Sequence, residues 1–186
     1  LSGNDDGLKR FRQRTYETAH WDQVITGYKE LERPTRFWNT ENGTTLTKLQ
    51  DLISRVCAEV LKVELQRQPD GQTVAWLPPH IIDLSEDGEI FPHVDSIKHS
   101  DQIVAGLSLL SPRVMKLREP KDAIADYSNE DAGIDMLLPP RSLYIISKDA
   151  RFKMAHSIAK EKASGRRLSL IFRDDLPPPW IRKTPS

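Results

Sequence analysis

The stretch QIVAGLSLLSPRVMKL (Gln102–Leu117) decides the fold class of this chain. It holds two short runs of mostly aliphatic residues, Gln102–Leu110 and Arg113–Leu117, separated by Ser111-Pro112. Serine followed by proline is typical of a turn, and short apolar runs bounded by turn residues are typical of strands. The stretch therefore predicts two successive strands rather than one helix.

Further runs of this kind occupy the rest of the C-terminal part, with turn residues such as Asp87-Gly88 and Pro139-Pro140 between them. From Gln72 onward the apolar residues recur with a period of two, which indicates strands and not helices. The additional predicted strands are Thr73–Trp76, His80–Leu84, Glu89–Val94, Ile134–Leu138, Ser142–Ile146, Arg151–Ile158 and Arg167–Phe172.

Upstream of Gln72 the spacing predicts two helices. Apolar residues of Trp21–Leu31 recur with helical spacing, and Pro34, which disfavours continuation of a helix, follows them. A second helix is predicted after Asn42-Gly43, where Leu46, Leu49, Leu52, Ile53, Val56 and Val60 share one face and Thr44 or Thr45 can cap the first turn. We expect Cys57 to pack inside this helix.

Helices followed by many short strands indicate an α+β, mainly β protein. The expected architecture is a double-stranded β-helix, a jelly-roll or cupin-like barrel, with N-terminal helices packed on one sheet. We expect a single domain over residues 11–176, with helices over about 21–62 and the barrel over about 72–173. Residues 1–10 are expected to be a flexible segment and residues 177–186 a Pro-rich tail.

Composition excludes several classes of protein. The 186 residues are 38% hydrophobic and 29% charged, which is the balance of one globular domain. The longest largely apolar run, Ile103–Leu110, is far shorter than the ~20 residues of a membrane helix, so we expect no membrane insertion. Cys57 is the single cysteine, which excludes an internal disulfide and a thiolate zinc cage.

The charge of the chain is zero overall but unevenly distributed. Residues 151–186 contain nine Lys or Arg and three acidic residues, a net charge of +6, which leaves −6 for residues 1–150. Strongly basic nucleic-acid binders carry a positive field over the whole molecule, which is missing here. An anion, either a small carboxylate or a phosphate backbone, can nevertheless be bound near the C-terminal strand.

The spacing His-x-Asp recurs in the chain, and one such pair lies in a strand-like run. His93 and Asp95 are two residues apart in such a run, so both side chains leave the same face and can share a metal ion. His99 and Asp101 lie in a polar stretch that predicts a turn, and we do not expect them to take part. Alternatively, His93 forms only a hydrogen bond at a strand end and Asp95 begins the turn. The spacing by itself is a weak signal.

His156 is the third candidate ligand, because it alternates with apolar residues in the predicted strand Arg151–Ile158. Two imidazoles and one carboxylate form the facial triad typical of non-haem Fe(II). Zinc hydrolysis suits the same ligands, so the set alone does not decide the chemistry.

Two arginines on the last predicted strand favour an oxygenase. In Arg167-Leu-Ser-Leu-Ile-Phe-Arg173, residues Arg167, Ser169 and Arg173 share one face. Side chains that lean inward from this face can hold a dicarboxylate, and arginine binds a carboxylate with two parallel hydrogen bonds. In the alternative interpretation both arginines point into water.

Four motifs in this order resemble the AlkB family of Fe(II)- and 2-oxoglutarate-dependent dioxygenases. They are His93-x-Asp95, LLPPRSLYII (Leu137–Ile146), the run Ala150–Ile158 with His156, and Arg167-x-Ser-x-x-Phe-Arg173. The resemblance covers about residues 74–173 and is strongest to a mitochondrial branch of the family. It implies a mitochondrial location, although no targeting segment is readable in this chain.

The resemblance implies roles for seven residues. His93, Asp95 and His156 would bind Fe(II). Arg167 would pair with the distal carboxylate of 2-oxoglutarate and Arg173 would support the cosubstrate near the metal. Tyr144 would donate its hydroxyl to a cosubstrate carboxylate, unless it is only a half-buried barrel tyrosine, and Ser169 would join the same network.

The sequence departs from the family in two places. Repair enzymes that act on nucleic acids carry a polar Asn-x-Tyr pair upstream of His-x-Asp, whereas the corresponding residues here are Ile82 and Leu84. The connection from His156 to Arg167 is also short for the family. The first departure removes two polar side chains from the usual cosubstrate site, and the second indicates that a loop is trimmed.

The resemblance thus implies an enzyme that uses Fe(II), 2-oxoglutarate and O2 to oxidise a C–H bond and releases succinate and CO2. We expect a protein or small-molecule substrate and no duplex DNA, while RNA N-demethylation stays open because of the basic C-terminal region. The rival hypotheses are a catalytically weak barrel that acts as an interaction module and a zinc hydrolase on a cupin scaffold.

Overall fold

The computed structural model describes residues 15–18, 23–32, 44–71, 73–120, 133–160 and 165–177. Within these ranges the chain forms helices and antiparallel strands in the order β1 (Ile25–Glu32), α2 (Thr44–Val56), β2 (His80–His93), β3 (Ile103–Leu110), β4 (Arg113–Arg118), β5 (Ile134–Leu138), β6 (Ser142–Ser147), α4 (Lys148–Phe152), β7 (Ala155–Ile158) and β8 (Arg167–Arg173).

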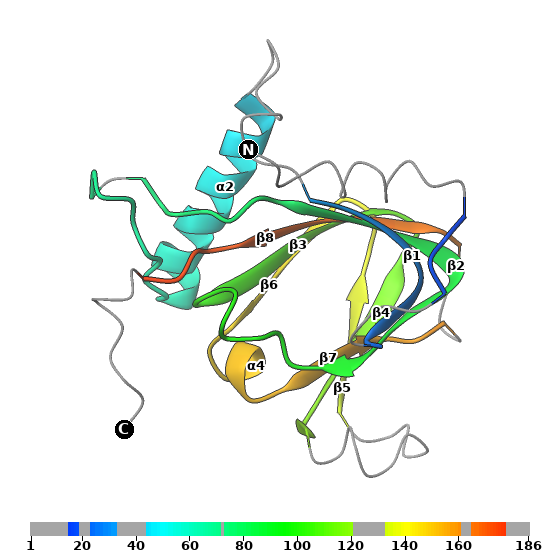
Figure 1. Ribbon diagram of the computed structural model, residues 1–186. Coiled ribbons are helices and arrows are strands. Elements are labelled where there is room, and N and C mark those ends of the chain that lie inside the picture. Colours follow the sequence, from blue (N-terminus) through cyan, green and yellow to red (C-terminus); the bar gives the residue numbers. More distant parts are fainter. Residues whose placement is uncertain are drawn as a thin grey trace.

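The strands form one rolled antiparallel sheet that nearly closes into a barrel (Figure 1). Neighbours follow the order β5-β4-β7-β2-β8-β3-β6, and β1 pairs with β2 beside this path. The last strand of the chain, β8, therefore lies between β2 and β3. The expected mainly β, jelly-roll-like architecture is confirmed.

Strand β2 turns the corner between the two halves of the barrel. Residues 80–84 pair with β8, and Ile90 and His93 pair with β7. Residues 85–88 bulge out opposite Gly27, whose φ is +62° and where a Cβ would lie 2.7 Å from the Cα of Gly88. The predicted strands His80–Leu84 and Glu89–Val94 are thus one bent strand, because two glycines permit close approach at the corner.

The helix predicted over Trp21–Leu31 is wrong in its described part, which is strand β1. Ile25, Tyr28 and Leu31 are all buried, with a spacing of three residues that imitates a helix. The irregularity between Thr26 and Tyr28 breaks the alternation of the strand, and Leu31 is buried on the face opposite Tyr28. The helical spacing therefore came from residues on both faces of an irregular strand.

The second predicted helix is confirmed as α2, which continues as a π-helical turn over Cys57–Leu61. Leu46, Ile53 and Cys57 are buried and pack against a core that includes Ile103 and Phe172 from β3 and β8. Figure 1 shows α2 against the outside of the sheet beside β3, β6 and β8. Burial raises the pKa of the Cys57 thiol to about 11, so this cysteine is a packing residue.

Two other strand predictions were wrong in part. Thr73–Trp76 forms only isolated bridges, Arg67 with Val74 and Trp76 with Asp174. The predicted strand Arg151–Ile158 begins only at Ala155, because α4 occupies the preceding residues. Lys153 and Asp149 form an i,i+4 ion pair of 3.0 Å there, which favours the helical turn.

Some predictions lie outside the described residues. These are the flexible segment 1–10, most of the Pro-rich tail 177–186, the Asn42-Gly43 helix start and part of the connection from His156 to Arg167. Among the described helices, none has both the length and the apolar character that crossing a membrane requires.

Candidate active site

Three predicted ligands converge where β2 and β7 meet. His93 on β2 lies directly opposite His156 on β7, and their ring centroids are 4.3 Å apart. Asp95, just beyond the end of β2, completes the group, and one ligand atom from each of the three residues lies within 4.8 Å of the others. The pairing of β2 with β7 thus brings His156 to two residues, His93 and Asp95, that precede it by 61 positions or more.

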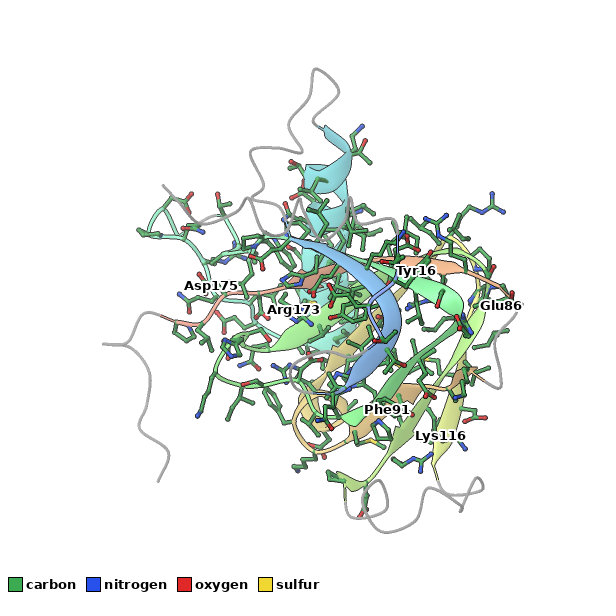
Figure 2. All side chains as sticks on the ribbon, turned by 45° about the vertical axis from the view of Figure 1, so that its right-hand side comes forward. Tyr16, Glu86, Phe91, Lys116, Arg173 and Asp175 are labelled. Carbon is green, nitrogen blue, oxygen red and sulfur yellow. The ribbon has the colours of Figure 1, made fainter. Side chains whose placement is uncertain are left out.

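The carboxylate of Asp95 is held between a guanidinium and an imidazole. Its Oδ1 accepts a hydrogen bond of 3.1 Å from Arg173 Nη2, and its Oδ2 lies 3.4 Å from His156 Nε2. Burial by itself would raise the pKa of Asp95, but the nearby charges of Arg173, His156 and His93 outweigh it and lower the pKa to about 2. Asp95 is therefore ionised at neutral pH. Its partner Arg173 lies at the end of β8 (Figure 2).

Both imidazoles are suited to metal ligation. His93 Nδ1 lies 2.8 Å from the carbonyl oxygen of Phe91, to which it donates, so its Nε2 lone pair is available. Burial, and then the charge of His93, lower the pKa of His156 to about 4, which keeps this ring neutral at pH 7. Two imidazoles and one carboxylate without a thiolate fit Fe(II).

One cavity of about 650 Å³ contains the group. Its walls come from β1, β2, β3, β4, β6, β7 and β8, and they include all seven residues singled out from the sequence: His93, Asp95, Tyr144, His156, Arg167, Ser169 and Arg173. The two arginines thus point inward, and the alternative in which both point into water is wrong.

Arg167 is fixed at one end of the cavity by two serines. Its side chain is 1% exposed, Nε donates to Ser108 Oγ at 3.2 Å, and Nη1 donates to Ser169 Oγ at 3.2 Å. Ser108 and Ser169 lie opposite each other on β3 and β8. Nη2 is buried and has no hydrogen-bond partner among the described residues, which leaves a donor for an anion in the cavity.

Comparison with curated proteins shows the family of the chain. It is 35% identical over 173 residues to the mitochondrial alpha-ketoglutarate-dependent dioxygenase alkB homolog 7 of Mus musculus, covering 88% of this chain and 67% of the relative. The Bos taurus protein of the same name is 34% identical over 174 residues, covering 87% and 66%. The chain belongs to the AlkB family. It spans about two thirds of the length of these relatives.

Solved structures agree on the fold of this AlkB-family chain, although no family model matches it. OsALKBH1 is 13% identical, with a TM-score of 0.54 and coverage of 90% of this chain and 89% of the other. A Pseudomonas putida prolyl-4-hydroxylase is 13% identical, with a TM-score of 0.57 and coverage of 92% and 83%. At this level of identity the likeness shows the barrel alone.

Membership in the AlkB family confirms the expected enzyme class, an Fe(II)- and 2-oxoglutarate-dependent dioxygenase, and the cofactors Fe(II), 2-oxoglutarate and O2. It decides against the zinc hydrolase. The mitochondrial location is confirmed as well, since both relatives are named as mitochondrial.

The two apolar residues that replace the polar pair of the AlkB repair enzymes lie differently in the structure. Ile82 lines the cavity, whereas Leu84 is fully buried in the core. His99, which we did not expect to ligate, lines the cavity but is outside the group of convergent ligand atoms, and Asp101 does not line it.

Sequence reasoning missed Arg151, which supports the loop that carries Asp95. This side chain is 2% exposed and reaches from α4 to the carbonyl oxygen of Asp95 at 2.7 Å. It also donates to the carbonyl oxygen and the hydroxyl of Ser100 at 3.2 and 2.8 Å. The predicted strand over Arg151 gave no indication of this role, because the guanidinium reaches the loop from a helical turn.

A second missed group lies on the cavity wall formed by β1 and β2. His80 Nδ1 is 2.8 Å from Glu30 Oε1, and His80 Nε2 is 3.2 Å from Glu32 Oε2. Burial would lower the pKa of His80, but the two carboxylates outweigh it and raise the pKa. No sequence signal was available, because Glu30 lies inside the segment predicted as a helix, Trp21–Leu31, and Glu32 directly follows it.

Gly106 makes room for the Tyr144 ring, and alanine there should be costly. A Cβ at this position would lie 2.2 Å from Tyr144 Cζ and 2.3 Å from its Oη. We expect Gly106→Ala to lower the free energy of unfolding by about 1–3 kcal/mol through overpacking. In a Tyr144→Leu background the same change should cost much less. Urea unfolding of the four proteins checks this, and additive costs would contradict the contact.

Proposed function

We propose that this protein couples the oxidative decarboxylation of 2-oxoglutarate to oxidation of a C–H bond in a protein side chain or a small metabolite. Succinate and CO2 are the expected coproducts. The observation that carries the proposal is the convergence of His93, Asp95 and His156 in the same cavity as the buried Arg167. One end of this cavity suits a metal and the other suits a carboxylate.

In this proposal His93, Asp95 and His156 hold Fe(II), which supplies the O2-activating chemistry when bound. Arg173 keeps the Asp95 carboxylate ionised and oriented, since it donates to Oδ1 at 3.1 Å. Arg151 fixes the backbone of the same loop. Both contacts join groups of the protein itself, so the protein orients the ligands.

The cosubstrate would lie along β8, between the two ends of the cavity. Arg167 would take the distal carboxylate with its unpartnered Nη2, while Ser108 and Ser169 prevent the guanidinium from turning away. The Tyr144 hydroxyl, which is packed over Gly106, would donate to a cosubstrate carboxylate. Arg173 would support the end nearer the metal.

Part of the remaining wall, beside the polar group of His80, Glu30 and Glu32, favours an apolar substrate portion. Ile25, Ile90, Met115 and Ile158 line the cavity, and Ile82 stands where repair enzymes of the family carry a polar residue. These side chains offer no hydrogen bonds to the edge of a base. A carbon chain of a protein side chain or of a small metabolite suits these walls better.

Basic residues of the C-terminal region are already engaged, which weakens the case for RNA. Arg151 and Arg167 are buried, and Arg173 pairs with Asp95. The other described basic residues after Ala150 also have acidic partners: Lys153 with Asp149, Lys160 with Glu89, and Arg166 with Asp83. Among the described residues, the positive charges of this region therefore offer few contacts to a phosphate backbone.

Succinate production tests the proposal. The protein with Fe(II), ascorbate, O2 and 2-oxoglutarate is given peptide mixtures, small metabolites or N-methylated single-stranded RNA at about 50 and about 200 mM salt. We expect peptide or metabolite samples to stimulate succinate release with a shallow salt dependence. Stimulation by RNA that falls by orders of magnitude with salt would favour the N-demethylase. Absence of succinate in every sample would favour the interaction module.

A further inference from the structure

A second arginine, Arg113 on β4, lies buried near Arg167. Its side chain is 1% exposed, and it shares the inward face of β4 with Met115, which lines the cavity. Burial lowers its pKa, the positive charge of Arg167 lowers it further, and the nearby carboxylate of Glu86 opposes both by raising it. Two guanidiniums thus approach each other at the end of the barrel opposite Arg173.

Backbone carbonyl oxygens hold Arg113 in this place through one nitrogen of its guanidinium. Nη2 donates to the carbonyl oxygens of Ser85 at 2.8 Å, Gly165 at 2.8 Å and Glu86 at 3.2 Å. These carbonyls belong to the β2 corner and to the residues before β8, and Figure 2 shows Glu86 at the side of the barrel away from Arg173. The contacts fix the position of the guanidinium but bring it no full negative charge.

The other nitrogens of Arg113 are unsatisfied. Nε and Nη1 are buried without a hydrogen-bond partner, as is Nη2 of Arg167. Among the described residues no carboxylate forms an ion pair with Arg113 or Arg167, whereas Arg166 on the outer face pairs with Asp83 at 2.6 Å. A buried charge without an ion-pair partner is costly, and two of one sign favour binding of an anion beside them, since the Glu86 carboxylate near Arg113 forms no ion pair with either.

We propose that Arg113 is a positioning residue for the cosubstrate, whose charge behind Arg167 strengthens binding of the distal carboxylate. The inference rests on the role proposed above for Arg167. Arg167 would contact the carboxylate. Arg113 would act without contact, because its positive charge would attract the carboxylate and repel the Arg167 guanidinium toward the cavity. The consequence is selectivity for dicarboxylate 2-oxo acids over monocarboxylates.

Binding calorimetry with Mn²⁺ in place of iron tests the inference, with 2-oxoglutarate and the monocarboxylate 2-oxopentanoate as probes. Arg113→Met should raise the Kd of 2-oxoglutarate about tenfold, which corresponds to ~1.4 kcal/mol. It should leave the Kd of 2-oxopentanoate unchanged. Arg113→Lys, which keeps the charge, should restore most of the affinity for 2-oxoglutarate.

Arg118→Met is the matched control, because Arg118 is a buried arginine on the same strand whose position has the opposite parity. We expect no change in either Kd. An unchanged Kd for 2-oxoglutarate in Arg113→Met would overturn the inference. So would equal losses for both probes, or a folded Arg113→Lys as weak as Arg113→Met, since each would indicate a structural role.

Failure of the proposed function would look different. If the unchanged protein binds no 2-oxoglutarate in the presence of Mn²⁺, the role of the whole cavity is wrong and this inference falls with it. If the unchanged protein binds 2-oxoglutarate and Arg167→Met does not, the proposed function stands, whatever the affinity of Arg113→Met for 2-oxoglutarate.

Discussion

Alanine in place of His93 or His156 should abolish 2-oxoglutarate turnover. Each imidazole is one of three ligand atoms that lie within 4.8 Å of one another, and neither has a substitute in that group. Changes to residues that merely orient metal ligands already cost about 10–100-fold in metal affinity or activity, so loss of a ligand should exceed about 100-fold. Calorimetry with Mn²⁺ measures the affinity, and succinate release measures turnover.

His99→Ala is the control for this experiment. His99 lines the same cavity but lies outside the convergent group, so its loss should leave metal affinity and turnover largely intact. Circular dichroism of each variant shows whether the barrel is retained. Full metal affinity in His156→Ala, or its loss in His99→Ala, would contradict the ligand assignment.

Replacement of Arg167 should have the second largest effect. We expect Arg167→Met to raise the Kd of 2-oxoglutarate by about 100-fold or more, roughly 2.7 kcal/mol, because a buried carboxylate would lose its counter-charge. Arg167→Lys should raise it about tenfold, since an ammonium cannot form two parallel hydrogen bonds. Calorimetry of the Mn²⁺-loaded protein gives both values.

Arg166→Met is the matched control for Arg167. Arg166 precedes Arg167 directly, but its Nε and Nη2 donate to the two oxygens of Asp83, and half of its side chain is exposed. Its loss should lower stability, because the buried Asp83 carboxylate loses its counter-charge, but should leave the Kd of 2-oxoglutarate unchanged in the folded protein. If both Arg167 variants bind 2-oxoglutarate like the unchanged protein, another residue anchors the distal carboxylate.

Most of the barrel could be predicted because local signals and the final structure agree. The Ser111-Pro112 turn separates β3 from β4, and the period-two pattern of Arg167–Arg173 places its two arginines on the cavity face. The spacing of His93 and Asp95 brought both to the site, although Asp95 lies just beyond the strand. No local pattern in the sequence predicts that β2 and β7 pair. This pairing is what brings His156 to His93 and Asp95.

Two of the errors share a physical origin, which is that a bulge or a helical turn breaks the period of a strand. Gly27 disturbs the alternation in β1, so residues buried on two faces imitated a helix, and the carboxylates of Glu30 and Glu32 went unnoticed. The helical turn α4 likewise interrupted a predicted strand and concealed Arg151. Neither event leaves a clear local signal, because the pairing partners lie more than 40 residues away.

The position of β8 in the sheet determines when the site can form during synthesis. Because β8 is the last of the described strands and yet lies between β2 and β3, the ribosome must release about residue 173 before the sheet can close. Until then Asp95 lacks the Arg173 counter-charge and the cavity lacks Arg167. A nascent or prematurely terminated chain can therefore display the histidines but cannot build the complete site, so cosubstrate binding reports that translation has passed the last strand.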